Sequence, residues 1–155
     1  MREAGPRQEL VAGFGEAGAE VHRAVEGLPE EEMSRPAIDG WSVKDHLIHM
    51  TVWHEFRFQE ISRIARGGQS AYLVLPPEQI DDLNERLVAW RRHLPASQAL
   101  ADLDFARSLV IEAINGAPDD ALRDERYGEV GLHGGIEHDL EHADTIRKWR
   151  EKTGL

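Results

Sequence analysis

The sequence contains no cysteine among its 155 residues. Disulfide bonds, thiolate ligands for a metal and a cysteine nucleophile are therefore excluded, and any thiol chemistry would need a thiol from outside the chain. The sequence also lacks an uninterrupted apolar run of the roughly 18 residues that a membrane span requires. Its first residues do not resemble the apolar core of a secretory signal. We therefore expect a soluble protein of the cytoplasm.

Positive charge is scarce in this chain. The 18 lysine and arginine residues face 29 aspartate and glutamate residues, which gives a formal net charge of −11 at pH 7. So large a negative excess repels phosphate backbones and anionic lipid surfaces, and no basic stripe gathers the positive side chains. We therefore expect no nucleic-acid partner and no membrane binding, and we expect a small molecule as the substrate.

Apolar residues recur at helical spacing in several segments, and no segment shows convincing strand-like alternation. The pattern predicts helices over residues 8–28, 42–65, 78–93 and 97–116, and a last helix that follows a loop over 119–133 and runs to residue 152. We predict a single domain, residues 1–155, with an all-α fold: a four-helix bundle in which residues 69–93 form a helical crossover between the second and third bundle helices. Residues 72–75 are too short to indicate a sheet. Four tryptophans and several amphipathic helices favour a homodimer through helix faces.

Local signals mark the expected helix ends. Ser42 followed by Asp45 fits a capping box at the start of the second predicted helix, with Trp41 just outside it as a hydrophobic staple. Ser97 is the expected cap of the helix over 97–116. Three glycines in the first predicted helix weaken it by up to roughly 1 kcal/mol each relative to alanine, but permit close contact with a neighbouring helix. These are Gly13, Gly15 and Gly18.

Two histidines four residues apart, His138 and His142, lie in the last predicted helix. Positions four apart differ by about 40° around a helix and by one turn along it, so both imidazoles can reach one small ion. Neutral imidazole is the commonest protein ligand of zinc-like metals. The alternative, two half-exposed polar residues without a ligand, is disfavoured by apolar residues beside the pair. These are Ile136, Leu140, Ala143 and Ile146. Because two histidines on one helix rarely suffice to bind a metal ion, a third ligand is expected. His49 in the second predicted helix is the candidate.

Three segments of the sequence carry a family resemblance. They are residues 40–45 (GWSVKD) with Leu47 and His49, the pattern His138-x-x-x-His142 with Ile146, and residues 83–85 (LNE). Over residues 10–149 the chain thereby resembles the DinB-like superfamily, four-helix bundles that include mycothiol-dependent maleylpyruvate isomerases and other thiol transferases. The resemblance implies one divalent metal ion, zinc or nickel, held by His49, His138 and His142. The thiol-dependent isomerases have glutamate at the position that matches His138, so the chain departs from that branch.

Three neutral imidazoles leave coordination positions of Zn²⁺ or Ni²⁺ open, as in catalytic rather than structural sites. An open metal lowers the pKa of bound water to about 7 or deprotonates a coordinated thiol. We interpret the chain as a metal-dependent hydrolase or a thiol-dependent transferase that acts on a small metabolite or xenobiotic. The alternative is a non-catalytic stress-response protein that binds a metal or ligand. Because the imidazoles must be neutral to bind, we expect metal affinity to fall as the pH drops through about 6.5.

Other polar side chains near the three histidines have two interpretations each. Glu141, about 60° from His138 around the helix, is the candidate catalytic carboxylate that orients a ligand or acts as a base; the alternative is a solvated salt-bridge partner. Asp45 is a helix cap or a catalytic group. His46 either contacts and supports one of the ligand histidines or lies at the boundary of the core. His133 is either an extra ligand or an exposed loop residue. No role is expected for His22, His54 and His93.

Overall fold

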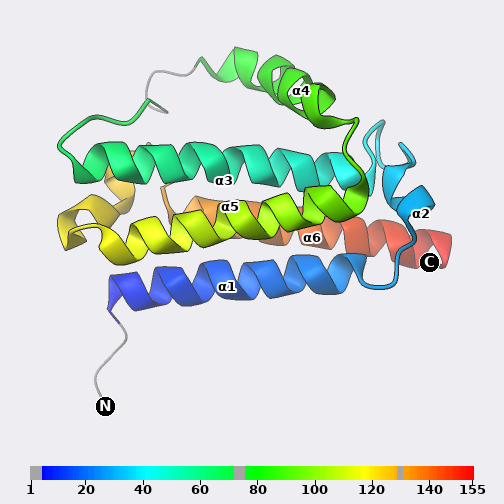
Figure 1. The fold of residues 1–155 in the computed structure, drawn as a ribbon, viewed down its shortest axis with the longest axis horizontal. Helices are drawn as coiled ribbons and strands as arrows, with labels where there is room; N and C mark the ends of the chain where they lie inside the picture. The colour runs from blue at the N-terminus through cyan, green and yellow to red at the C-terminus, as the bar shows by residue number, and fades with distance from the viewer. Residues whose placement is uncertain (1–4, 72–75, 129–130) are drawn as a thin grey trace.

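The computed structural model describes residues 5–71, 76–128 and 131–155. Within these residues no strand occurs, and one isolated bridge joins Ile38 to Trp41. The helices follow one another as α1 (Pro6–Val25), α2 (Glu30–Ser34), α3 (Val43–Ala65), η2 (Pro77–Gln79), α4 (Ile80–Arg91), α5 (Ala96–Gly116), η3 (Asp119–Leu122), η4 (Asp124–Tyr127) and α6 (His133–Thr153) (Figure 1). The predicted all-α class is confirmed. Residues 72–75, for which no sheet was predicted, lie outside the described residues.

Four long helices, α1, α3, α5 and α6, form the bundle. Helix α3 packs against α5 and α6, and α1 packs against α6 and α5. Helix α4 lies on the outer side of α3, away from the other three helices (Figure 1), and packs on α3. It carries the chain back along the bundle, so that α3 and α5 run in the same direction. The predicted crossover between the second and third bundle helices is therefore confirmed.

The interior of the bundle contains two hydrophobic clusters. One is built around residues such as Val21, Leu47, Leu103 and Ile146, and the other around residues such as Phe14, Ile61 and Val110. On α3, α5 and α6, four of the residues between the two clusters are polar or charged but still buried. They are His54, Arg57, Arg107 and Asp139. None of the described helices combines the length and the apolar content needed to cross a membrane.

The predicted capping box at the start of α3 is confirmed. The Asp45 N–H donates to Ser42 Oγ at 3.0 Å, and the Ser42 N–H donates to Asp45 Oδ2 at 3.0 Å. The predicted cap at Ser97 is wrong, because α5 begins one residue earlier, at Ala96, after Pro95. A carboxylate from α2 caps that helix instead: the Ala96 N–H donates to Oε1 of Glu30 at 2.5 Å. The acceptor at this helix start thus comes from a side chain distant in sequence, whereas the sequence predicted a local one, Ser97.

Two of the three glycines in α1 allow close approach, as predicted. A Cβ at Gly13 would lie 2.5 Å from Cδ1 of Ile136, and a Cβ at Gly18 would lie 2.8 Å from Nη1 of Arg107. The prediction is wrong for Gly15, where a Cβ would meet nothing within 4 Å. Leu140 also differs from expectation: it is 39% exposed, because it lies about 200° around α6 from His138, beyond the buried face.

Candidate metal centre

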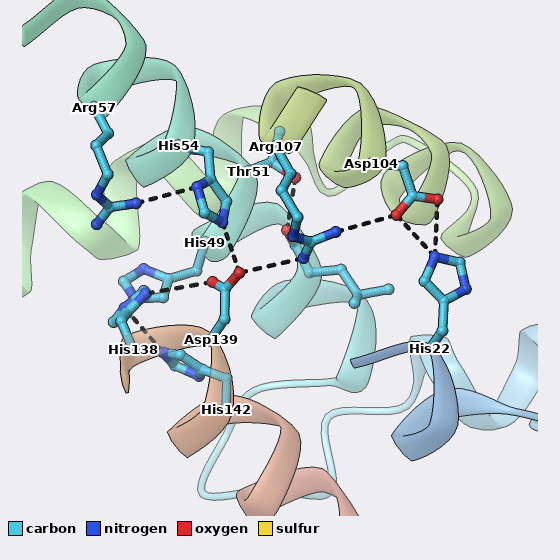
Figure 2. Close-up of polar contacts among 11 residues, drawn as sticks. His22, His49, Thr51, His54, Arg57, Asp104, Arg107, His138, Asp139 and His142 are labelled. Atoms are coloured by element: carbon cyan, nitrogen blue, oxygen red, sulfur yellow. Dashed lines mark hydrogen bonds and ion pairs between the residues drawn. The ribbon is translucent and has the colours of Figure 1, made fainter. Parts of the chain in front are cut away.

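Three imidazoles from two facing helices meet at one point of the bundle (Figure 2). His49 comes from α3, whereas His138 and His142 lie one turn apart on α6. Nε2 of His138 lies 2.8 Å from Nε2 of His49 and 3.1 Å from Nε2 of His142. Each residue offers one nitrogen, and these nitrogens all lie within 4.8 Å of one another. The structure therefore brings together the three residues that the sequence predicted as ligands, in an arrangement that could hold a metal ion.

The cluster is partly open to solvent. His49 is buried, but His138 and His142 are half-buried, and 25% of the His138 side chain is exposed. In the described part of the chain, no fourth histidine, aspartate or glutamate joins this group. A closed structural site would need four protein ligands, so an ion held here would keep a position for a ligand from solvent.

His46 contacts the nitrogen of His142 that faces away from the cluster. The two Nδ1 atoms lie 2.7 Å apart, and His46 is buried. Because Nε2 of His142 faces His138, this contact holds the ring of His142 from its outer side. Of the two interpretations of His46, the structure favours the one in which it supports a ligand.

Burial keeps the four imidazoles neutral. Desolvation lowers the pKa of His46 and His138 to about 4, of His49 to about 3 and of His142 to about 2. Repulsion from a charged His138 adds to desolvation at both His49 and His142. The lone pairs are therefore available to a metal at neutral pH. The lowered pKa values indicate that protons compete for these nitrogens at a lower pH than the expected 6.5.

A layer of buried polar side chains lies behind the cluster (Figure 2). Asp139 Oδ2 lies 2.7 Å from Nε2 of His54 and accepts from Nη2 of Arg107 at 3.2 Å. Nη1 of Arg57 donates to Nδ1 of His54 at 3.1 Å. Because arginine only donates, Nδ1 of His54 must be an acceptor, and the proton of this imidazole sits on Nε2. His54 is therefore a neutral donor to Asp139.

Positive charge in this layer keeps Asp139 ionised. Burial alone would raise the pKa of Asp139, but His54, Arg107 and Arg57 outweigh it and hold the pKa below its ordinary value. Burial lowers the pKa of His54, in keeping with its neutral form. Two glycines make room for the guanidinium groups. One is Gly18, opposite Arg107, and the other is Gly135, where a Cβ would lie 2.4 Å from Nε of Arg57.

The remaining sequence candidates lie around the cluster rather than in it. Glu141 is exposed on α6, and its role stays a prediction. The Asp45 side chain closes the capping box at the start of α3 by accepting from the Ser42 N–H, and it also pairs with Arg92 at 3.2 Å, which favours the structural interpretation. His133 is exposed at the start of α6, and its Nδ1 lies 2.7 Å from Oδ2 of Asp124, which favours the interpretation as a surface residue.

Asp139 and His54 are the residues that sequence reasoning missed, since His54 was expected to have no role. Helical phase could have found both. Asp139 lies about 40° from Ala143 and about 20° from Ile146 around α6, in the middle of the buried face. His54 lies about 20° from Leu47 around α3, again on the buried stripe. A charged or polar residue in such a position requires a buried partner.

Two indole rings stand beside His49. The ring centroid of Trp41 lies 5.2 Å from that of His49, and the centroid of Trp53 lies 6.4 Å from it. Both indoles are held by the crossover helix α4: Nε1 of Trp41 donates to Oε2 of Glu85, and Nε1 of Trp53 donates to Oδ1 of Asn84, each at 2.9 Å. Helix α4 therefore fixes the apolar walls next to the cluster.

Comparison with known proteins gives one family and two similar folds. The sequence profile described as DinB superfamily matches residues 14–146. The crystal structure of an uncharacterised protein from Escherichia coli UTI89 aligns with a TM-score of 0.79 and 17% identity over 96% of this chain and 95% of that one. The crystal structure of a protein from Streptococcus pneumoniae aligns with a TM-score of 0.77 and 14% identity over 97% and 93%. Identities this low establish similarity of fold alone. No curated protein matches the chain.

Proposed function

The chain belongs to the DinB superfamily, and we propose that it is a divalent-metal-binding enzyme, a hydrolase or a thiol-dependent transferase of a small metabolite or xenobiotic. The observation that carries this proposal is the convergence of His49, His138 and His142, whose ring nitrogens meet within 4.8 Å. All three are neutral at pH 7, because desolvation lowers each pKa to about 4 or below.

The donor set fits zinc or nickel. Imidazole suits both ions, whereas Mg²⁺ and Ca²⁺ prefer oxygen ligands. Zinc binds imidazole nitrogen at about 2.0–2.1 Å, so the nitrogens of a tetrahedral site lie about 3.3 Å apart. The three ligand nitrogens lie within 4.8 Å of one another, and the two separations that involve His138 are 2.8 and 3.1 Å, so small shifts of the rings would bring the nitrogens to this spacing. The side chains would therefore accept such an ion without rearrangement of the helices.

A bound zinc or nickel ion supplies Lewis-acid chemistry and lowers the pKa of a water or a thiol. The chain has no cysteine, so a thiol-dependent reaction would require a thiol cosubstrate. The half-buried rings of His138 and His142 support access for either reactant. His46 holds the ring of His142 from outside. Glu141, exposed on the same helix, is the proposed base.

The surroundings of the site favour a small substrate with an apolar part. Trp41 and Trp53 present indole rings beside His49, and neither is fully buried. Aromatic faces of this kind contribute binding area next to the reacting group. The net charge of −11 disfavours polyanionic substrates and nucleic acid.

Cobalt substitution tests the proposal. Co²⁺ replaces zinc in imidazole sites and gives a visible absorption spectrum that changes when an exogenous ligand binds. We expect a spectrum in the wild-type protein that shifts when azide or a small thiol is added, and no spectrum in His142→Ala. Glu141→Gln should keep the spectrum and lower the turnover of any substrate found. A wild-type spectrum that neither azide nor a thiol changes would contradict the open site and favour a non-catalytic metal-binding protein.

A further inference from the structure

Two buried polar atoms beside the cluster face each other without a hydrogen bond. Nδ1 of His138 and Oδ1 of Asp139 are both buried, and neither has a hydrogen-bond partner among the described residues. They lie 3.9 Å apart (Figure 2), about 1 Å more than an N–H···O hydrogen bond. Buried polar atoms are nearly always paired. An unpaired donor-capable atom opposite an unpaired acceptor therefore indicates a function for the pair.

The position of Asp139 is fixed from its other side. Oδ2 already receives Nε2–H of His54 at 2.7 Å and Nη2–H of Arg107 at 3.2 Å. Arg107 is in turn tied to Asp104, and His54 to Arg57. The carboxylate cannot turn without breaking these bonds, so Oδ1 keeps its direction toward His138.

We propose that Asp139 is a positioning residue for His138: Oδ1 accepts the Nδ1–H of His138, and Nε2 is thereby left as the unprotonated nitrogen that binds the metal. This inference rests on the proposed metal site. The other tautomer would set two acceptors, Nδ1 and Oδ1, against each other in a buried place. It would also put the proton on Nε2, the atom that lies 2.8 Å from His49 and 3.1 Å from His142.

The structure predicts what an amide would do at this position. In Asp139→Asn, the two donors from His54 and Arg107 require the amide oxygen at the place of Oδ2. The amide NH₂ group then points to Nδ1 of His138 as a donor. His138 can accept it only with the proton on Nε2, so the substitution inverts the tautomer and blocks the ligand nitrogen. Loss of such an outer partner reduces metal affinity by about 10–100-fold.

Two separate measurements test the inference: the tautomer of His138 and the affinity of the protein for zinc. Long-range ¹H–¹⁵N spectra of metal-free wild-type and Asp139→Asn protein report which nitrogen of each neutral histidine carries the proton, and His138→Gln assigns the signal. Zinc affinity is measured by competition with a chromophoric chelator. Asp144→Asn is the matched control, because it removes one negative charge from the same helix, where Asp144 pairs with Arg147 and Lys148 near the surface. Circular dichroism establishes that each variant is folded.

We expect His138 to carry its proton on Nδ1 in the wild type and on Nε2 in Asp139→Asn, with zinc affinity reduced at least 10-fold in Asp139→Asn and unchanged in Asp144→Asn. A proton on Nε2 of His138 in the wild type would overturn the inference, and this holds even if Asp139→Asn fails to fold. Equal zinc affinities of folded Asp139→Asn and Asp144→Asn would also overturn it. A wild-type protein that takes up no zinc would refute the proposed function instead, while the tautomers would still decide the role of Asp139.

Discussion

The substitution Gly18→Ala probes the buried polar layer directly. A Cβ at this position would lie 2.8 Å from Nη1 and 2.9 Å from Cζ of Arg107, well inside normal van der Waals contact. The guanidinium cannot move freely, because Arg107 is 5% exposed and donates to Asp139 and Asp104, each at 3.2 Å. Both distances are at the upper end for such bonds. Any displacement of the guanidinium group therefore breaks at least one of them.

The expected effect follows from two opposing contributions. Loss of a charge-assisted hydrogen bond costs about 1.5–3 kcal/mol, whereas replacement of a helical glycine by alanine stabilises by up to about 1 kcal/mol. We therefore expect Gly18→Ala to lower the free energy of unfolding by about 0.5–2 kcal/mol, which is the loss minus a gain of about 1 kcal/mol.

Gly15→Ala is the matched control on the same helix. A Cβ there meets nothing within 4 Å, so only the gain in helix propensity remains, and we expect stabilisation by up to about 1 kcal/mol. Urea unfolding followed by far-ultraviolet circular dichroism measures both variants. If the two substitutions shift the midpoint in the same direction, the close contact between α1 and Arg107 does not exist as described.

Three further predictions concern acid stability, capping and assembly. The four imidazoles of His46, His49, His138 and His142 have pKa values of about 2–4 when folded and about 6.5 when unfolded. The unfolded state thus binds more protons below pH 6.5, and stability, fully present above that pH, falls as the pH drops toward 4. Relative to pH 7, each such histidine lowers the free energy of unfolding at pH 5 by about 2 kcal/mol. An equal free energy of unfolding at pH 7 and pH 5 would refute this prediction. Ser42→Ala should cost about 1 kcal/mol because it removes a cap, whereas Ser97→Ala should change the stability by less than about 0.5 kcal/mol; equal losses would contradict the assignment of the helix start. Light scattering should give twice the monomer mass, and a monomer at all concentrations would exclude the proposed homodimer.

Much of the fold was predictable because each bundle helix buries a stripe at helical spacing. The start of α3 was also predictable, since the capping box formed by Ser42 and Asp45 is local in sequence. The start of α5 was not, because its capping carboxylate comes from Glu30, 66 positions earlier in the chain. Capping signals in a sequence assume that the acceptor is close in sequence to the helix start. Here tertiary packing brings the acceptor from a distant residue.

The histidine cluster was predictable from local sequence, whereas the polar layer behind it depends on contacts between helices. His138 and His142 share a face through helix geometry alone. His49 was the candidate third ligand because a helical pair rarely suffices to bind a metal, and the family resemblance implied the same three residues. Asp139 was not singled out, since a charged residue in a helix is usually solvated. Its burial depends on Arg107 and His54, which the bundle brings from other helices. The expected pH dependence of metal binding used the ordinary imidazole pKa for a related reason: the desolvation that lowers these pKa values depends on packing.

Elemental analysis of the purified protein, with single histidine variants, tests the metal site most directly. The site requires one zinc or nickel ion per chain in the wild type and in His93→Ala, since His93 is exposed and lies outside the group of three. His49→Ala, His138→Ala and His142→Ala should each lose most of the metal, because each removes one of three ligand nitrogens. Metal retained by these three variants at the level of His93→Ala would contradict the site.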